Sequence, residues 1–390
     1  MIKKIFLLLL PIFAVLFSSC LSTQVKQSNI SFSSEVENKY VRIGIVLNTA
    51  YFTVSSAKTI SVTDASGKKL TLSKGNVKFS YYSNGKLGFN DESLSFPVKI
   101  ESANNVIYVN KKAYRGSLVI NKDGDSVNVI NVLPVEDYIK GVLPKEANAG
   151  WHAEALKTQA VISRTYTLAN LGKHKDKGFD MCSTTHCQVY AGAEVETAAT
   201  NKAVSQTEGQ VLTYNGKFAN TFFHANCGGH TEDPKYVWDT KDTPEYLKGV
   251  KCGYCKNAPH SSWEQSLDES FIRSKLSAAG FNVGIIKSIK VKGETPAGSA
   301  KEIVINGSKN TVTINAYKFR LAVDAWKIKS VTFDGIKKSD DNFIFKGHGW
   351  GHKVGLCQWG AKGMAESGKN YQKILKHFYP GTKLEKVQYK

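Results

Sequence analysis

After its first twenty residues, the sequence has no apolar run long enough to cross a bilayer, so no later spanning helix is expected. It also shows no internal repeat. Acidic residues are few, because 33 Asp and Glu stand against 52 Lys and Arg, which gives a formal net charge of +19. A basic balance favours polyanionic partners, which outside the cytoplasm are wall polymers and lipid headgroups and not nucleic acid. The same lysines could equally serve only to keep the protein soluble.

The first twenty residues have the anatomy of an export signal. Two lysines precede the apolar residues 5–17, and small residues follow, ending in Cys20. The Phe-Ser-Ser-Cys ending resembles a bacterial lipobox, which predicts a chain anchored in the cell envelope through acylated Cys20, facing the periplasm or the cell wall. An ordinary secretory peptide with an incidental cysteine is the alternative. A labelled fatty acid should be incorporated by the wild type and not by Cys20→Ala; equal labelling of both would exclude this anchor.

The rest of the chain predicts an α+β protein in several parts. Residues 21–38 are polar and resemble a tether. Residues 39–116 contain short strand-like runs separated by turn signals, which predicts a β-rich unit. Residues 117–385 follow as a mixed region with a mixed α/β subdomain over residues 266–346. Helices are expected near residues 137–141, 152–171, 269–279, 316–324 and 371–377.

Four ordered stretches carry the residues suited to chemistry. They are residues 136–166, with Gly141-Val142-Leu143-Pro144-Lys145-Glu146 at their centre, 182–192, 223–232 and 347–355. Together they resemble the SpoIID/LytB family. The resemblance implies a lytic transglycosylase that cleaves the bond between N-acetylmuramic acid and N-acetylglucosamine in glycan strands without stem peptides. It also leaves open a non-catalytic glycan-binding enhancer of a wall amidase, and a hydrolase that shares the cleft but uses water is a third reading.

The resemblance assigns the catalytic role to Glu146. A transglycosylase needs one carboxyl group, because the 6-hydroxyl of the sugar replaces the water that other glycosidases must activate. Such an acid needs apolar surroundings that raise its pKa. An exposed glutamate at the start of a helix is the ordinary alternative. Glu136 and Glu154 are rival carboxylates, although either could pair with a nearby lysine.

Two cations are expected to assist. Lys157 and Arg164 are seven residues apart, which on a helix returns them to nearly the same face. Both match the family pattern, and together they could bind the lactyl carboxylate of muramic acid. Two solvated charges, or an ion pair with Glu154, are the alternatives.

Six of the seven cysteines fall into two groups. His174, Cys182, His186 and Cys187 offer two imidazoles and two thiolates, a tetrahedral zinc set of the structural kind. A Cys182–Cys187 disulfide is the alternative outside the cytoplasm. The second group comprises Cys227, Cys252, Cys255 and Cys357. It could form another metal site or two disulfides, and the spacing of the cysteines does not favour one over the other.

A glycine-rich loop over residues 347–360 is the last candidate. Its glycines permit tight turns and close approach of the backbone to a ligand. We expect His348, Trp350, His352 and Gln358 to contact sugar. A metalloprotease is disfavoured, because the HExxH helix that it requires is not apparent. A purely structural turn is the remaining alternative.

Overall fold

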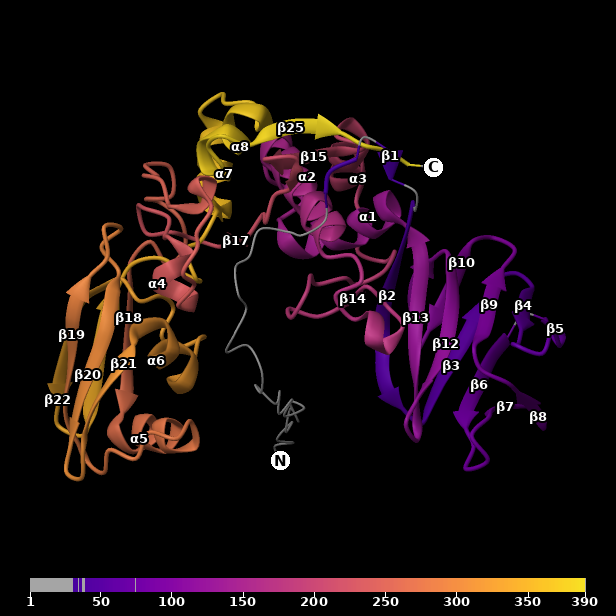
Figure 1. The fold of residues 1–390 in the computed structure, drawn as a ribbon, viewed down its shortest axis with the longest axis horizontal. Coiled ribbons are helices and arrows are strands. Elements are labelled where there is room, and N and C mark those ends of the chain that lie inside the picture. The colour runs from indigo at the N-terminus through magenta and orange to yellow at the C-terminus, as the bar shows by residue number, and fades with distance from the viewer. Residues whose placement is uncertain (1–30, 34, 37–38, 74, 390) are drawn as a thin grey trace, which may run out of the picture.

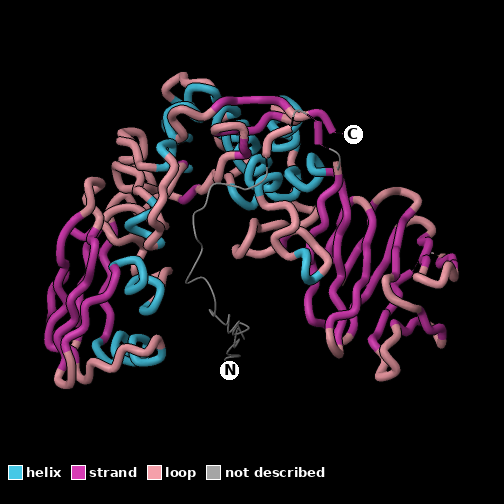
Figure 2. The backbone as a smooth tube through the Cα atoms, in the orientation of Figure 1, coloured by secondary structure: helices cyan, strands magenta, loops and turns pink. Residues whose placement is uncertain are grey.

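The computed structural model describes residues 31–33, 35–36, 39–73 and 75–389, and it confirms the α+β class. Two β-rich arms flank a helical centre, so the described chain forms an arch (Figure 1). Many of the helices gather at the centre, the N-terminal arm consists mainly of strands and loops, and the other arm combines strands with helices on its side towards the centre (Figure 2). The two arms are therefore joined through the helical centre.

The N-terminal arm contains two sheets that share one core. Their orders are β14-β2-β13-β12-β9-β4-β5 and β11-β10-β3-β6-β7-β8. The strands are β2 (Tyr40–Thr49), β3 (Tyr51–Ser56), β4 (Ile60–Thr63), β5 (Lys69–Leu72), β6 (Gly75–Tyr81), β7 (Leu87–Phe89), β8 (Glu92–Leu94), β9 (Val98–Ser102), β10 (Val106–Val109), β11 (Lys112–Arg115), β12 (Ser117–Asp123), β13 (Ser126–Pro134) and β14 (Met181–Cys182). Side chains alternate across each strand, so Phe52 and Val54 of β3 both point into the core.

This arm crosses the boundary that the sequence suggested at residue 116. Strands β12 and β13 lie after it, yet they pair with β9 and β2, which lie before it. The β-rich unit therefore extends to Pro134, the residue before α1.

The end of the predicted tether, residues 21–38, already contacts the folded domain. The amide of Phe32 donates to the carbonyl of Gly216 at 2.8 Å, and its ring meets Phe218 edge-on. β1 (Glu35–Val36) pairs in parallel with β26 (Gln388–Tyr389). The predicted acylation site Cys20 lies outside the described residues.

Helix α2 (Ala153–Ala169) is the central element of the arch. Its neighbours are α1 (Val135–Glu146), α3 (Ala198–Gln206), α7 (Gln358–Glu366), α8 (Tyr371–Phe378) and β15 (Gln210–Tyr214). Because elements surround it, α2 is buried on nearly every side and not along one face only. Its polar residues, Arg164 among them, therefore also face protein.

The C-terminal segment returns to this centre. β25 (Lys383–Lys386) pairs with β15, which also pairs with β16 (Lys217–Phe218). Helix α7 occupies the end of the stretch that we expected to be a loop, residues 347–360. Its glycines are required by close neighbours, since a Cβ at Gly360 would lie 2.6 Å from the Cys252 sulfur and one at Gly363 2.2 Å from the Tyr254 carbonyl oxygen.

The second arm holds the mixed subdomain predicted over residues 266–346. It has its own core, with Phe319, Phe343 and Phe345 among the buried residues. Its elements are β18 (Trp263–Asp268), α5 (Glu269–Ala278), β19 (Ile286–Glu294), β20 (Ala300–Gly307), β21 (Thr311–Asn315), α6 (Ala316–Val323), β22 (Phe333–Ser339) and β23 (Asn342–Gly347). The arm is joined to the centre by β17 (Phe223–His224), which pairs in parallel with β24 (Leu356–Cys357). The connecting stretches also contain the short helices η1 (Lys175–Lys177), α4 (Pro234–Trp238) and η2 (Glu245–Leu247).

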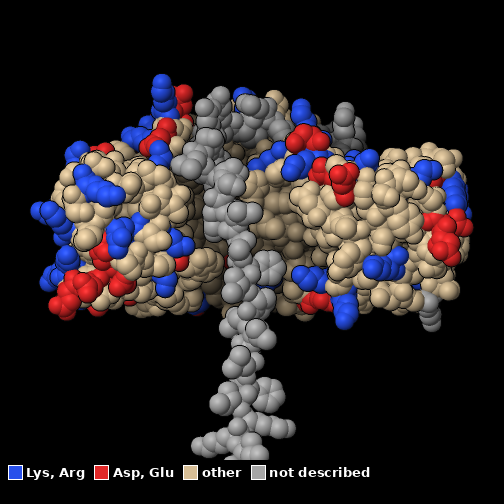
Figure 3. Space-filling view, turned by 90° about the horizontal axis from the view of Figure 1, so that it is seen from below, with Lys and Arg blue, Asp and Glu red and all other residues tan. Residues whose placement is uncertain are grey.

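The surface carries charge on both arms. Seen from below, lysine and arginine side chains are spread over the two arms and are not gathered in one patch, and the surface between the arms is recessed (Figure 3). Among the described residues, we find no helix that is long and apolar enough to span a membrane.

Candidate active site

Glu146 is the last residue of α1, at the carboxyl end of that helix and not at a helix start. Its side chain is half-buried, and Oε1 accepts a hydrogen bond from the amide of Val189 at 3.2 Å. Its carbonyl oxygen accepts from Nε2 of Gln358 at 2.8 Å. The structure thus brings together two residues that lie 212 positions apart in the sequence and were both predicted for the site.

The surroundings of Glu146 favour its neutral form. Burial raises the pKa of the carboxyl group, and the Val189 amide and the charge of Lys145 oppose the shift without cancelling it. The helix dipole acts in the same direction as burial, since the carboxyl end of a helix carries partial negative charge. Within the described part of the chain, Glu146 forms no ion pair.

The two rival carboxylates are engaged elsewhere. Glu136 binds Arg164 through two parallel hydrogen bonds, of 2.7 and 2.8 Å. Glu154 pairs with Lys157 at 2.8 Å. Burial pulls the pKa of Glu154 upward, but hydrogen bonds from Lys157 and from the Tyr371 amide outweigh it, so this pKa is lowered. Neither group is therefore arranged as a proton donor.

The expected pair of substrate-binding cations does not form. Arg164 has no exposed surface, and besides Glu136 its guanidinium donates to the carbonyls of Gln210 and Val204. All of its contacts are internal, so the prediction that it binds a glycan carboxylate is wrong. Helical periodicity placed Arg164 on a face with Lys157, but could not tell that protein covers that face. Lys157 remains partly exposed and is paired with Glu154.

Two tryptophans lie near Glu146 and its partner Gln358 in the sequence. Trp151, five residues after it, meets Trp359 edge-on with ring centroids 5.3 Å apart, and Lys362 lies 5.4 Å from the Trp359 ring. Both tryptophans are half-buried. Gln159, which sequence reasoning missed, positions the amide of Gln358 through its Oε1 at 3.3 Å. Its place within the stretch 136–166, which carries the family resemblance, was the available signal.

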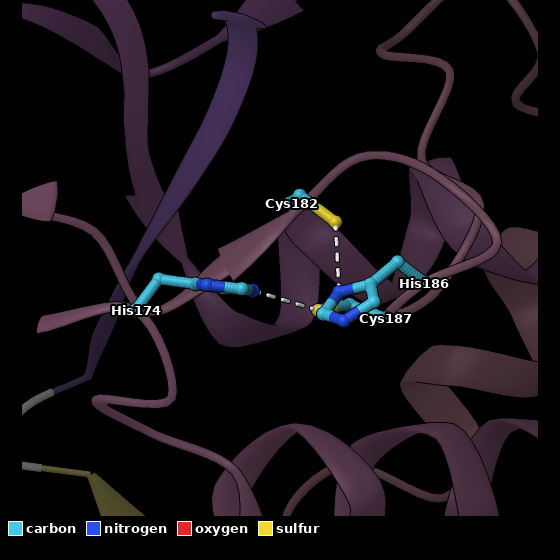
Figure 4. A group of neighbouring side chains, drawn as sticks. All are labelled: His174, Cys182, His186 and Cys187. Carbon is cyan, nitrogen blue, oxygen red and sulfur yellow. Dashed lines mark hydrogen bonds between the residues drawn. The ribbon is translucent and has the colours of Figure 1, made fainter. Parts of the chain in front are cut away.

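The four predicted metal ligands converge on one point (Figure 4). The ligand atoms of His174, Cys182, His186 and Cys187 all lie within 4.8 Å of one another. The Cys187 sulfur is 3.4 Å from nitrogens of both His174 and His186, and the Cys182 sulfur is 3.7 Å from His186. Around a tetrahedral zinc ion, a sulfur and a nitrogen ligand would be separated by about 3.6 Å. The residues therefore fit such an ion, and both thiols are free of a disulfide.

The segment that carries the metal ligands leads directly to the residue that binds the Glu146 side chain. Cys187 lies two residues before Val189, whose amide holds the Glu146 carboxylate. Between them, buried Gln188 donates to the carbonyl of Ser163 in α2 at 3.2 Å. Cys182 lies in β14, the edge strand beside β2, so the loop is also fixed to the N-terminal arm.

The predicted sugar-binding residues of the glycine-rich loop lie in different environments. His348 contacts the Ser261 carbonyl at 2.8 Å and the Asp334 carboxylate at 2.7 Å. His352 lies between the rings of Trp238 and His224, and burial lowers its pKa to about 4. These two side chains are thus held by protein groups.

Trp350 contributes to an aromatic and basic patch on the second arm. Its ring contacts His260 at 4.7 Å and Trp326 at 5.6 Å, and the Lys329 ammonium lies 5.1 Å from it. Trp326, which is 69% exposed, was missed because nothing in its local sequence marked it.

Comparison with known families covers most of these residues. The SpoIID model, described as stage II sporulation protein, matches residues 123–214, which include Glu146 and the four metal ligands. A model of a domain of unknown function, DUF8618, matches residues 234–355, which include the second arm.

Three curated proteins are similar over most of the chain. An uncharacterized protein of Brachyspira hyodysenteriae is 38% identical over 69% of this chain and 71% of its own length. Stage II sporulation protein D of Bacillus subtilis is 30% identical over 65% of this chain and 75% of its own. The amidase enhancer of Bacillus subtilis is 31% identical over 63% of this chain, but over only 40% of its own length.

Proposed function

The chain belongs to the SpoIID family, and from this premise we propose that it is a lytic transglycosylase that cleaves peptidoglycan glycan strands with Glu146 as its acid and base. One observation carries the proposal. Glu146 is a half-buried carboxyl with a raised pKa and no cation bound to it among the described residues, whereas both rival carboxylates are in ion pairs. A proton donor at neutral pH requires that environment.

The reaction needs no second carboxylate. Neutral Glu146 protonates the oxygen that leaves as the bond from C1 of N-acetylmuramic acid breaks. The resulting carboxylate then takes the proton of the 6-hydroxyl, whose oxygen bonds to C1 and closes a 1,6-anhydro ring. Glu146 ends protonated, as it began, and no water is consumed.

The neighbours of Glu146 act as positioning residues. The Val189 amide fixes one carboxylate oxygen and leaves the other for the sugar. Gln358 anchors the end of α1 through the Glu146 carbonyl. The metal ligands would hold a zinc ion that braces the loop carrying Val189, and closed coordination by four protein ligands makes this a structural role.

We assign glycan contacts outside the cleavage point to the patch of Trp326, Trp350, Lys329 and His260. Flat aromatic faces suit the apolar faces of sugar rings, and the Lys329 ammonium suits the lactyl carboxylate of muramic acid. Trp326→Ala should weaken binding of denuded glycan strands about 3- to 10-fold, since one exposed aromatic contact is worth roughly 1 kcal/mol.

The matched control for this binding measurement is Tyr108→Ala, an exposed aromatic residue on the other arm. Titration calorimetry with purified strands would measure both. Equal affinities for the wild type and Trp326→Ala would exclude the patch as a glycan-binding site.

The test of the whole proposal is an analysis of products. Denuded and peptide-bearing peptidoglycan are incubated with the protein, and the released fragments are separated by chromatography. Anhydro-muramic ends from denuded strands are expected. New reducing ends would instead identify a hydrolase and contradict the proposed reaction.

The similarity to an amidase enhancer supports a second candidate. Here the chain would bind denuded glycan and present it to a wall amidase without cleaving it. Absence of any released fragment, together with stimulation of an added amidase, would favour this function. Either function places the protein in the cell envelope, and Cys20 acylation would hold it at a membrane.

A further inference from the structure

Four cysteines outside the proposed active site meet at one buried point. Cys227 follows β17, Cys252 and Cys255 belong to the stretch before β18, and Cys357 ends β24. Each is at most 2% exposed, and their four sulfur atoms lie within 4.8 Å of one another. Three segments, separated by up to 130 residues, thus place their thiol groups at one point.

The spacing of the sulfurs fits one tetrahedral ion. The Cys227 and Cys255 sulfurs are 3.5 Å apart, and those of Cys252 and Cys255 are 3.8 Å apart. Four thiolates around zinc would be separated by about 3.8 Å, given metal–sulfur bonds of about 2.3 Å. A disulfide would need about 2.05 Å, and all four thiols are free. An iron–sulfur cluster would hold its cysteines further apart, because several iron and sulfide ions lie between them.

The surroundings are those of a thiolate site. The amides of Cys227 and Gly360 point at the Cys357 sulfur, at 3.3 and 3.2 Å, where they would offset negative charge. Gly360 has no side chain at the place where a Cβ would approach the Cys252 sulfur to 2.6 Å. Cys252-Gly253-Tyr254-Cys255 has the two-residue spacing common among zinc ligands.

A buried cation accompanies the cluster. Lys353 is 1% exposed, and its ammonium donates to the hydroxyls of Ser299 and Thr332 at 2.9 and 2.7 Å. Burial lowers its pKa, while the charges of Glu232 and of the cysteines oppose that shift. A metal site with four thiolates carries net negative charge, which such a cation would partly balance.

We propose that Cys227, Cys252, Cys255 and Cys357 bind a second zinc ion, which joins the second arm to the helical centre. Four protein ligands close the coordination shell, and burial keeps water and substrate away, so the ion is structural. Its position places it next to the segment that contacts Glu146. Cys357 caps α7, and the next residue, Gln358, contacts the carbonyl of Glu146. The proposal holds whether or not the chain cleaves glycan.

Metal content measured on the full chain tests this site. Native mass spectrometry of protein purified with zinc present should find two ions in the wild type. One ion should remain in Cys182→Ser/Cys187→Ser, one in Cys252→Ser/Cys255→Ser, and none in the combined variant. A wild type with a single ion and a mass lowered by the hydrogens of two disulfides would overturn the proposal.

A spectroscopic measurement tests the site without changing any of its four ligands, so misfolding of a variant cannot be mistaken for loss of the site. The Cys182→Ser/Cys187→Ser protein keeps all four proposed ligands, so it can be loaded with Co²⁺ in place of zinc. Intense sulfur-to-cobalt absorption typical of four thiolates is expected, and it should be lost on addition of excess zinc. Absence of these bands would exclude the site, and iron found in the protein as isolated would overturn the assignment to zinc.

Discussion

Glu146→Gln should abolish glycan cleavage and leave the fold and the metal content unchanged. Glutamine keeps an oxygen that can accept the Val189 hydrogen bond, so the local structure has no reason to change. It cannot give or take the proton that the reaction needs. Loss of one general acid typically costs about 10²- to 10⁴-fold in rate.

The measurement is the rate at which anhydro-muramic ends appear from denuded strands. Glu154→Gln is the matched control, because Glu154 is also a partly buried helical glutamate but is paired with Lys157. It should retain cleavage activity close to that of the wild type. Undiminished cleavage by Glu146→Gln would exclude Glu146, and inactivity of both variants would point to a general loss of structure.

The pH dependence of cleavage should report the same group. Glu146 acts first as an acid, so the rate should fall as the pH rises through its pKa. Because burial raises this pKa, activity should persist to higher pH than an ordinary glutamate would allow. Lys145→Gln removes a charge that lowers the pKa, so its activity should fall at a still higher pH; an unchanged or lower transition would contradict this assignment.

The candidate site could be predicted from the sequence where its residues lie close together in the chain. Cys182, His186 and Cys187 lie within six positions, so their spacing indicated a metal site before any fold was known. His174 was harder to assign, since its role depends on how η1 turns the chain back towards β14. Glu146 was identified through family resemblance, because nothing in its local sequence reveals the burial that raises its pKa.

Sequence reasoning failed where long-range packing determines the structure. Gly360 was predicted to be a loop residue, but α7 contains it because the stretch 252–255 packs against that helix. The boundary at residue 116 was wrong because a sheet can take its central strands from both sides of it. Arg164 carries the charge expected of an exposed residue, and only the elements packed around α2 show that it is internal.

Arg164→Met should destabilise the protein by about 3–5 kcal/mol, the cost typical of leaving a buried charge without its partner. Glu136 would then lose two charge-assisted hydrogen bonds and keep, among the described residues, the Gly209 amide, at 3.2 Å, and the Tyr389 hydroxyl, at 3.0 Å. Because these contacts join α1 and α2 to the C-terminal segment, the loss should appear as global unfolding at lower urea concentration. The single change Glu136→Gln should be similarly harmful.

The double variant Glu136→Leu/Arg164→Met separates this structural role from substrate binding. Removing both charges takes away the unpaired ion, so it should recover much of the stability that either single change loses. Lys157→Ala at the partly exposed Glu154 pair is the control, and it should cost only about 0.2–1 kcal/mol. If Arg164→Met instead kept its full stability and lost affinity for denuded strands, Arg164 would act on the glycan and its buried pairing with Glu136 would not describe the protein in solution.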